Sequence, residues 1–236
     1  MLLLLLSGFF GFTLYNFALN YGEKLVTSGS ACFIVNGGNL ITALLATLVL
    51  KEKVSSTTWW GMCISLMGVG VISIGESGTT FDKNIGALLI LLAAFSQSIY
   101  FILQKFLLSR YSGFELVCYS IWIGTIAMLP MSNGVNEIIR LSSIQSTIAV
   151  IYLGIFPAVV AYFCWTYVLS KLDASKAAIY LYLVPIVTII IGYLWIKEIP
   201  SITSIIGGVI TIGGILFAKY SKIFSRPPLN LNIRKF

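Results

Sequence analysis

The stretch 177-AAIYLYLVPIVTIIIGYLWIKE-198 decides the fold. It carries no charge over its first twenty residues, has Pro185 near its middle, and stops at the pair Lys197-Glu198. A second charge-free run, residues 199–218, follows at once and contains four glycines. Because an apolar segment of about 20 residues can cross a bilayer as a helix, this part of the chain predicts two consecutive membrane helices.

The same pair of runs occurs earlier in the chain. Residues 25–50 are charge-free, contain Gly37-Gly38-Asn39 in their middle and stop at Lys51-Glu52, and the glycine-bearing run 54–75 follows. A single shift of 146 residues superposes Lys51-Glu52 on Lys197-Glu198, Gly61 on Gly207, Gly68 on Gly214 and Gly8 on Gly154. One shift that holds over so long a span indicates an internal repeat, which is how many transporters are built.

The composition excludes a water-soluble domain. The chain is 58% hydrophobic and 10% charged, whereas soluble domains have about 25% charged residues. Between consecutive charges there are eight apolar runs: 1–22, 25–50, 54–75, 84–104, 116–136, 141–170, 177–196 and 199–218. Since helices satisfy their own backbone hydrogen bonds in lipid, the sequence predicts an all-α membrane protein, a bundle of about eight transmembrane helices.

The basic residues predict the orientation. When the loops are assigned alternately to two sides, eleven of the fifteen lysines and arginines fall on one side. Positive residues favour the cytoplasm, so both termini are expected there, in a plasma membrane of the bacterial inner-membrane type. The net charge of +7 lies in the loops and in a basic tail, residues 223–236, so no nucleic-acid partner is expected.

The two copies of the repeat are expected to have opposite orientations. The second, residues 82–222, has five spans, and the first, residues 1–75, has three. An odd number of spans inverts the next copy, and the charge count independently places Lys51-Glu52 inside and Lys197-Glu198 outside. The sequence therefore predicts two inverted repeats, the first of them incomplete.

These residues resemble a known family. The stretch Leu172-Asp173-Ala174-Ser175 through Pro185 to Lys197-Glu198, the run Gly207 to Gly214, and their copy at 25–70 resemble the EamA-type members of the drug/metabolite transporter superfamily. The resemblance implies ten helices in two inverted five-helix repeats, with solutes crossing between the halves. Compared with that pattern, about two helices are expected to be missing ahead of Met1, and Gly38 or Asn39 stands in place of the first proline.

The helix interruptions are the main guide to a site. Proline removes a helical hydrogen bond, so Pro185 is expected to free the Leu181 carbonyl at mid-membrane, with a matching break at Gly37–Asn39. Paired interruptions in both halves point to a midplane binding site. The alternative is a packing kink without a ligand, because glycine and proline are common in membrane helices.

Polar side chains in the apolar runs are the candidate ligands. Unpaired polar groups are costly in hydrocarbon, so these side chains must face the bundle interior. The predicted substrate-binding residues are Asn16, Asn36, Asn39, Gln97, Tyr100, Tyr162, Tyr180 and Pro185. For each amide, bonding between helices is an equally good interpretation. The chain has no histidine and no carboxylate at mid-span, so no metal, cofactor or catalytic site is expected.

The sequence thus predicts a secondary transporter that moves a small metabolite, amino-acid-like or otherwise amphipathic, by alternating access between the repeats. Its expected partners are that solute, the lipid bilayer and, as a further option, a second copy of the chain. The alternative is a truncated membrane protein that transports nothing and serves as a structural or dimerising subunit. An intramembrane enzyme is disfavoured because no nucleophile motif is present.

Overall fold

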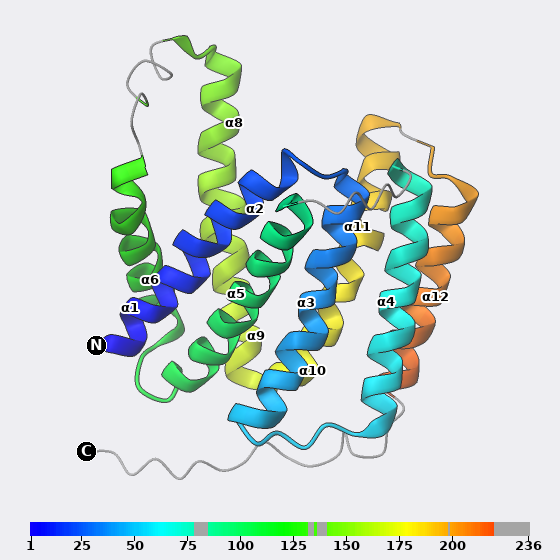
Figure 1. The fold of residues 1–236 in the computed structure, drawn as a ribbon, viewed down its shortest axis with the longest axis horizontal. Coiled ribbons are helices and arrows are strands. Elements are labelled where there is room, and N and C mark those ends of the chain that lie inside the picture. The colour runs from blue at the N-terminus through cyan, green and yellow to red at the C-terminus, as the bar shows by residue number, and fades with distance from the viewer. Residues whose placement is uncertain (78–84, 132–134, 136–140, 198, 220–236) are drawn as a thin grey trace.

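The computed structural model describes residues 1–77, 85–131, 135, 141–197 and 199–219, and all regular elements among them are helical. The helices lie together as a bundle (Figure 1). Seven helical stretches are long and apolar enough to cross a membrane: Leu2–Glu23, Ser28–Val49, Ser56–Ile74, Ile85–Leu107, Ile144–Lys171, Ala174–Trp195 and Ile202–Lys219. The prediction of an all-α, multi-helix membrane protein is confirmed.

Several of these stretches combine more than one kind of helix. The first consists of α1 (Leu2–Gly8), a π-helical segment (Phe9–Leu14) and α2 (Tyr15–Glu23). The next four helices are α3 (Ser28–Val49), α4 (Ser56–Ser77), α5 (Ile85–Leu107) and α6 (Gly113–Met128). Then come α8 (Ile144–Ile155), a second π-helical segment (Phe156–Ala161) and α9 (Tyr162–Lys171). The last are α10 (Ala174–Tyr180), a 3-10 turn (Leu181–Leu183), α11 (Val184–Ile191), a third π-helical segment (Gly192–Ile196) and α12 (Ile202–Lys219).

The fifth predicted span corresponds to α6, which is shorter among the described residues than the other seven stretches. Helix α6 begins at Gly113, earlier than the predicted run 116–136, because Ser112 and Glu115 form a capping box at its start. It has 16 residues before a 3-10 turn, Leu129–Met131, fewer than the roughly 17–25 that a transmembrane helix needs. Residues 132–134 and 136 of that run lie outside the described residues, as do Glu198 and the predicted tail.

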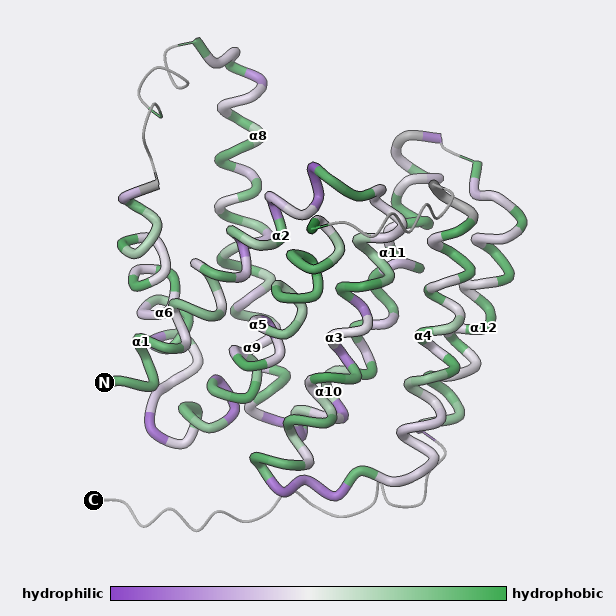
Figure 2. Tube along the Cα trace, viewed as in Figure 1, coloured by the Kyte–Doolittle hydropathy of each residue, from purple (hydrophilic) through white to green (hydrophobic). Residues whose placement is uncertain are grey.

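Hydropathy follows the helices. Apolar residues dominate the helices, while hydrophilic residues gather in the connections, as in the link between α3 and α4 (Figure 2). This is the distribution expected when backbone groups are satisfied within helices and charged side chains stay near water.

Helices α4 and α12 pack closely and run antiparallel, side by side in Figure 1. A Cβ atom added to Gly61 would lie 2.6 Å from the carbonyl oxygen of Gly214, and one added to Gly68 would lie 2.6 Å from that of Gly207. Small residues allow membrane helices to approach at backbone distance. The glycine-rich runs therefore serve close helix packing.

This contact has the symmetry of the repeat. Gly61 packs against Gly214, which the 146-residue shift makes the equivalent of Gly68. Gly68 packs against Gly207, the equivalent of Gly61. Ser65 Oγ donates to the Thr211 carbonyl at 3.2 Å, and Thr211 Oγ1 donates to the Ser65 carbonyl at 3.4 Å, between residues 146 positions apart. A pseudo-two-fold axis therefore passes close to Ser65 and Thr211, as expected of two inverted copies.

The π-helical segments recur in the same way. The segment Phe9–Leu14 contains Gly11, and the segment Phe156–Ala161 contains Pro157. Lys51 and Lys197, also equivalent by the shift, are the two non-glycine residues with positive φ in the described chain, at 56° and 59°. The two copies thus share local backbone features.

Two predicted interruptions are corrected. Helix α3 runs without a break from Ser28 to Val49, so Gly37–Asn39 do not interrupt it. A glycine costs a helix only about 1 kcal/mol, and Gly38 packs against α5, where an added Cβ would lie 3.1 Å from that of Ala94. The Leu181 carbonyl is not free either, because it accepts the Val184 N–H in the 3-10 turn.

Candidate functional site

An aromatic cluster joins three helical stretches inside the bundle. Phe12 lies in the first π-helical segment, Tyr100 in α5, and Tyr162 at the start of α9. The Phe12 ring centroid is 5.7 Å from that of Tyr100 and 4.8 Å from that of Tyr162, and the two tyrosine centroids are 5.9 Å apart. The structure therefore brings together two predicted site residues, Tyr100 and Tyr162, with a third aromatic from the first repeat.

The first π-helical segment makes this approach possible. A Cβ atom added to Gly11 would lie 2.4 Å from Cδ2 of Tyr100, closer than any side chain tolerates without a shift. Tyr100 itself is fully buried. Glycine at position 11 is therefore what lets the Tyr100 ring rest against the backbone beside Phe12.

A hydrogen-bond network continues from Tyr100 along α5 and α9. Gln104 Nε2 donates to the Tyr100 hydroxyl at 2.7 Å and to Thr166 Oγ1 at 2.9 Å. The Thr166 hydroxyl donates in turn to the Tyr162 carbonyl at 2.8 Å, so its oxygen is the acceptor toward Gln104. In this arrangement Gln104 Nε2 faces the two hydroxyl oxygens.

Two polar atoms in this region have no hydrogen-bond partner. Gln104 Oε1 is a buried acceptor without a donor, and Trp165 Nε1 is a buried donor without an acceptor. The Trp165 ring lies against Phe101, with centroids 4.4 Å apart, within the same cluster. Leaving such a group unpaired costs about 1–3 kcal/mol, so both atoms are suited to a ligand or a water molecule.

Asn16 and Gln97 lie next to this cluster. Asn16 Nδ2 donates to the Phe12 carbonyl at 2.7 Å, within its own helix. The Gln97 side chain lies within hydrogen-bonding reach of the Tyr15 hydroxyl, which joins α5 to α2. Both amides are half-buried.

Asn36 and Asn39 form a separate pair on α3. Asn39 Nδ2 donates to Asn36 Oδ1 at 3.5 Å, and Asn36 Nδ2 donates to the Cys32 carbonyl at 2.9 Å. Both side chains are buried, and in the described part of the chain they bond to each other and to Cys32 rather than to Tyr100 or Tyr162. The structure does not bring this pair into the aromatic cluster.

Tyr180 and Pro185 lie on the interrupted helix α10–α11. Tyr180 is 37% exposed, whereas Tyr182, two residues later, is fully buried. The Tyr182 hydroxyl is also without a hydrogen-bond partner, and its ring packs against α3, α4 and α12. Pro185 is buried in the first turn of α11, where an N–H would have no partner within the helix.

The predicted set omitted Phe12, Gln104, Trp165 and Tyr182. A signal for Gln104 was available, because it follows Tyr100 by four residues and so shares its helix face. Thr166 follows Tyr162 with the same spacing. Phe12 and Trp165 had no comparable signal, since an aromatic residue in an apolar run is usually a packing residue.

Metal binding has no support in this part of the chain. The described residues contain no group of three or more histidine, cysteine, aspartate or glutamate side chains that could hold an ion. The four cysteines, Cys32, Cys63, Cys118 and Cys164, form no disulfide.

The chain has curated relatives over most of its length. It is 42% identical over 224 residues to "Uncharacterized transporter YdfC" of Bacillus subtilis (strain 168), covering 93% of this chain and 73% of that protein. It is 29% identical over 211 residues to a "Probable terminal-alkyne amino-acid exporter" of Streptantibioticus cattleyicolor, covering 89% and 70%.

A solved structure supports the fold. A protein of known crystal structure matches with a TM-score of 0.75 at 18% identity, over 92% of this chain and 76% of that one. The model of the EamA-like transporter family matches residues 1–74 and 84–220. Membership indicates an integral membrane transporter rather than an enzyme. The chain belongs to the EamA-like transporter family, within the drug/metabolite transporter superfamily.

Proposed function

We propose that the protein is a secondary transporter that moves a small amino-acid-like or otherwise amphipathic solute by alternating access. The solute binds beside Tyr100, Tyr162 and Gln104, between the two repeats. The repeats comprise residues 1–75 and 82–222, and both termini face the cytoplasm of a bacterial inner membrane.

The observation that carries this proposal is the unpaired Gln104 amide oxygen. It is buried at the end of a hydrogen-bond network, and aromatic rings from both repeats lie beside that network. A buried acceptor of this kind is satisfied when a solute supplies a donor.

The chemistry of the cluster favours a particular class of solute. Its side chains are aromatic, amide and hydroxyl groups, with an acceptor at Gln104 and a donor at Trp165. Aromatic faces accommodate an apolar body or an ammonium group. An amino-acid-like molecule offers donors, acceptors and an apolar part, and one relative carries the name of an amino-acid exporter.

The symmetry of the fold favours alternating access. Helices α4 and α12 meet about a pseudo-two-fold axis at Ser65 and Thr211. Inverted repeats of this kind allow a central site to open to either side as one half rocks against the other.

The proposal is tested by solute counterflow in proteoliposomes, with a panel of neutral amino acids and amphipathic amines. We expect Gln104→Leu to lower flux at least about tenfold, because one charge-assisted or neutral hydrogen bond to a buried group accounts for a factor of that order. The matched control is Asn20→Leu, since the Asn20 amide is exposed and bonds to the Asn16 carbonyl of its own helix.

Thermal unfolding of each variant checks that it folds. Equal flux in the wild type and Gln104→Leu would remove Gln104 from the site. A well-folded wild type without flux for any solute would instead favour the structural or dimerising subunit, and Asn36, Asn39, Tyr180 and Pro185 would then be packing residues.

A further inference from the structure

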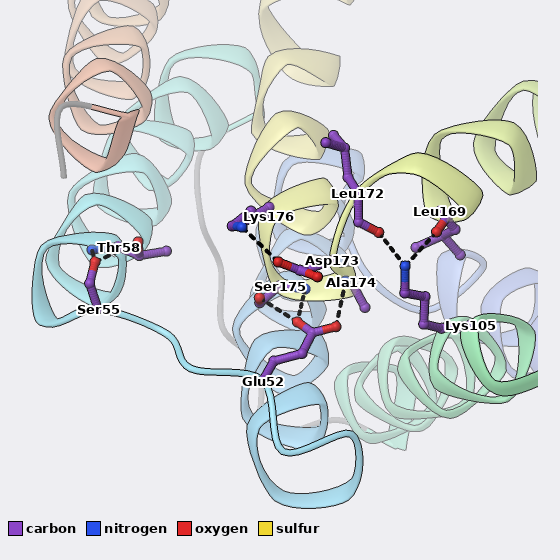
Figure 3. Close-up of polar contacts among 10 residues, drawn as sticks. All are labelled: Glu52, Ser55, Thr58, Lys105, Leu169, Leu172, Asp173, Ala174, Ser175 and Lys176. Carbon is purple, nitrogen blue, oxygen red and sulfur yellow. Dashed lines mark hydrogen bonds and ion pairs between the residues drawn. The ribbon is translucent and has the colours of Figure 1, made fainter. Parts of the chain in front are cut away.

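Glu52 joins the two halves of the protein at one end of the bundle. It follows α3 in the first half, and its carboxylate accepts the backbone N–H of Ala174 at 2.8 Å and that of Ser175 at 3.0 Å, at the start of α10 (Figure 3). It also accepts the Ser175 hydroxyl. Three hydrogen bonds therefore converge on one carboxylate from the opposite repeat.

The turn before Glu52 explains how it reaches this position. Lys51 has a φ of 56°, a left-handed conformation that non-glycine residues rarely adopt. The Glu52 N–H then donates back to the Ala46 carbonyl at 3.2 Å. This reversal at the end of α3 directs the Glu52 side chain across to α10.

The start of α10 is arranged to receive a carboxylate. Asp173 occupies the N-cap position but makes no capping hydrogen bond, and its side chain pairs with Lys176 at 2.6 Å. The first N–H groups of a helix need acceptors and favour negative charge. Glu52, in the connection between α3 and α4, supplies the cap that Asp173 does not.

Lys105 holds the other side of the same turn. Its Nζ donates to the Leu169 carbonyl at 2.8 Å and to the Leu172 carbonyl at 2.6 Å, at the end of α9 (Figure 3). The segment Leu169–Ser175, the α9–α10 turn, is thus held by α3 through Glu52 and by α5 through Lys105.

This turn closes the bundle near the aromatic cluster. Ala177, fully buried, packs with Ala46, Leu169 and Ala174 behind the turn, and Trp165 contacts the same group of residues. Lys105 is the neighbour of Gln104 on α5. The end of the bundle at Glu52 therefore lies next to the candidate site, with the α9–α10 turn across it.

We propose that Glu52 is a positioning residue that closes this end of the solute path by holding the α9–α10 turn. In this proposal the contact belongs to the state in which this end is closed, and it is released when this end opens. The proposal rests on the proposed function, but its test measures the accessibility of this end of the bundle without any solute.

The test measures the labelling rate of a buried reporter, Ala177→Cys, by a water-soluble maleimide in lipid nanodiscs. The four native cysteines are replaced by serine or alanine. Glu52→Gln keeps the shape but puts an amide NH2 toward an N–H donor, so we expect labelling at least about tenfold faster, the factor that a charge-assisted hydrogen bond represents.

The matched control is Glu115→Gln. Glu115 also accepts a backbone N–H and a serine hydroxyl, both from Ser112, but within the start of its own helix α6. We expect this variant to label within about twofold of the parent. A similar acceleration in both variants, or in neither, would overturn the proposal.

Ser175→Ala provides a second variant in case Glu52→Gln does not fold. It removes one of the three donors, so we expect a smaller acceleration of labelling. Its effect should shrink when Glu52 is already Gln, because both changes act on one contact. Independent effects that multiply in the double variant would contradict the proposed role of Glu52.

Discussion

The helical stretch Leu2–Glu23 and the stretch Ile144–Lys171 contain the two copies of one π-helical segment, yet their surroundings differ. In the first, Leu4, Ser7 and Gly8 of α1 are buried, together with three residues of the π-helical segment. In the second, neither α8 nor its π-helical segment has a buried residue. The same local backbone is thus inside the bundle in one copy and on its surface in the other.

This difference separates two causes of structure. The π-helical segment does not depend on the same packing in both copies, because it recurs where the neighbours differ. Burial depends on the neighbours, since α1 and its π-helical segment pack against α5 and α6. If this is correct, equivalent substitutions should have equal effects where both copies are covered and unequal effects where only one is.

The largest effects are expected where both copies are covered, in the contact between α4 and α12. A Cβ at Gly61 would lie 2.6 Å from the Gly214 carbonyl oxygen, and one at Gly207 would lie 2.6 Å from the Gly68 carbonyl oxygen. We expect Gly61→Ala and Gly207→Ala each to lower the free energy of unfolding by about 3 kcal/mol, because backbone on both sides must shift.

Chemical denaturation in detergent micelles measures both changes. The control is Gly213→Ala, where an added Cβ meets nothing within 4 Å. Clearly unequal losses for Gly61→Ala and Gly207→Ala would break the symmetry on which the comparison rests.

A smaller and one-sided effect is expected at the equivalent pair Gly8 and Gly154. A Cβ at Gly8 would lie 2.6 Å from that of Ile123 and 2.9 Å from the Ser120 carbonyl oxygen, whereas Gly154 has nothing within 4 Å. We expect Gly8→Ala to cost about 2 kcal/mol through overpacking. Gly154→Ala should be neutral or gain up to about 1 kcal/mol from helix propensity. Equal melting-temperature shifts for the two variants would show that burial is not what distinguishes the copies.

The smallest effect is expected at Ser7. Its hydroxyl shares a 2.9 Å hydrogen bond with that of Ser120 on α6, and both residues are fully buried. We expect Ser7→Ala to destabilise the protein by about 1 kcal/mol. The equivalent residue, Leu153, is 57% exposed, so Leu153→Ala should change stability by less than about 0.5 kcal/mol. Thermal unfolding measures the stability of both variants. A larger loss of stability for Leu153→Ala than for Ser7→Ala would contradict the expected difference in burial.

Most of the fold could be predicted from the sequence. Membrane helices need long charge-free runs, and the matching glycines and Lys-Glu pairs reveal the repeat. The contact between α4 and α12 follows from the glycines of the repeat. The break at Gly37–Asn39 was wrong, since a helix in lipid loses more by leaving backbone groups unpaired than by tolerating glycine. The presence of glycine alone does not show whether a helix is kinked there or packs closely against a neighbouring helix.

The candidate site was harder to predict. Tyr100 and Tyr162, both in the predicted set, lie side by side with ring centroids 5.9 Å apart. Tyr182 follows Tyr180 by two residues and therefore lies on a different face of the helix, so its ring is inside the bundle while Tyr180 is partly exposed. The contact of Glu52 with α10 joins residues 122 and 123 positions apart and had no sequence signal beyond a charge at a helix end.

Ser65 and Thr211 occupy a mechanically special place. If the two halves exchange conformations during transport, the second state is the first one turned about the pseudo-two-fold axis, and a rotation leaves its own axis unmoved. The hydrogen bonds of 3.2 and 3.4 Å between these residues would therefore survive the exchange. Contacts far from the axis, such as that of Glu52 with Ser175, are the ones that must break. The close contact between α4 and α12 can therefore persist while the two halves move about it.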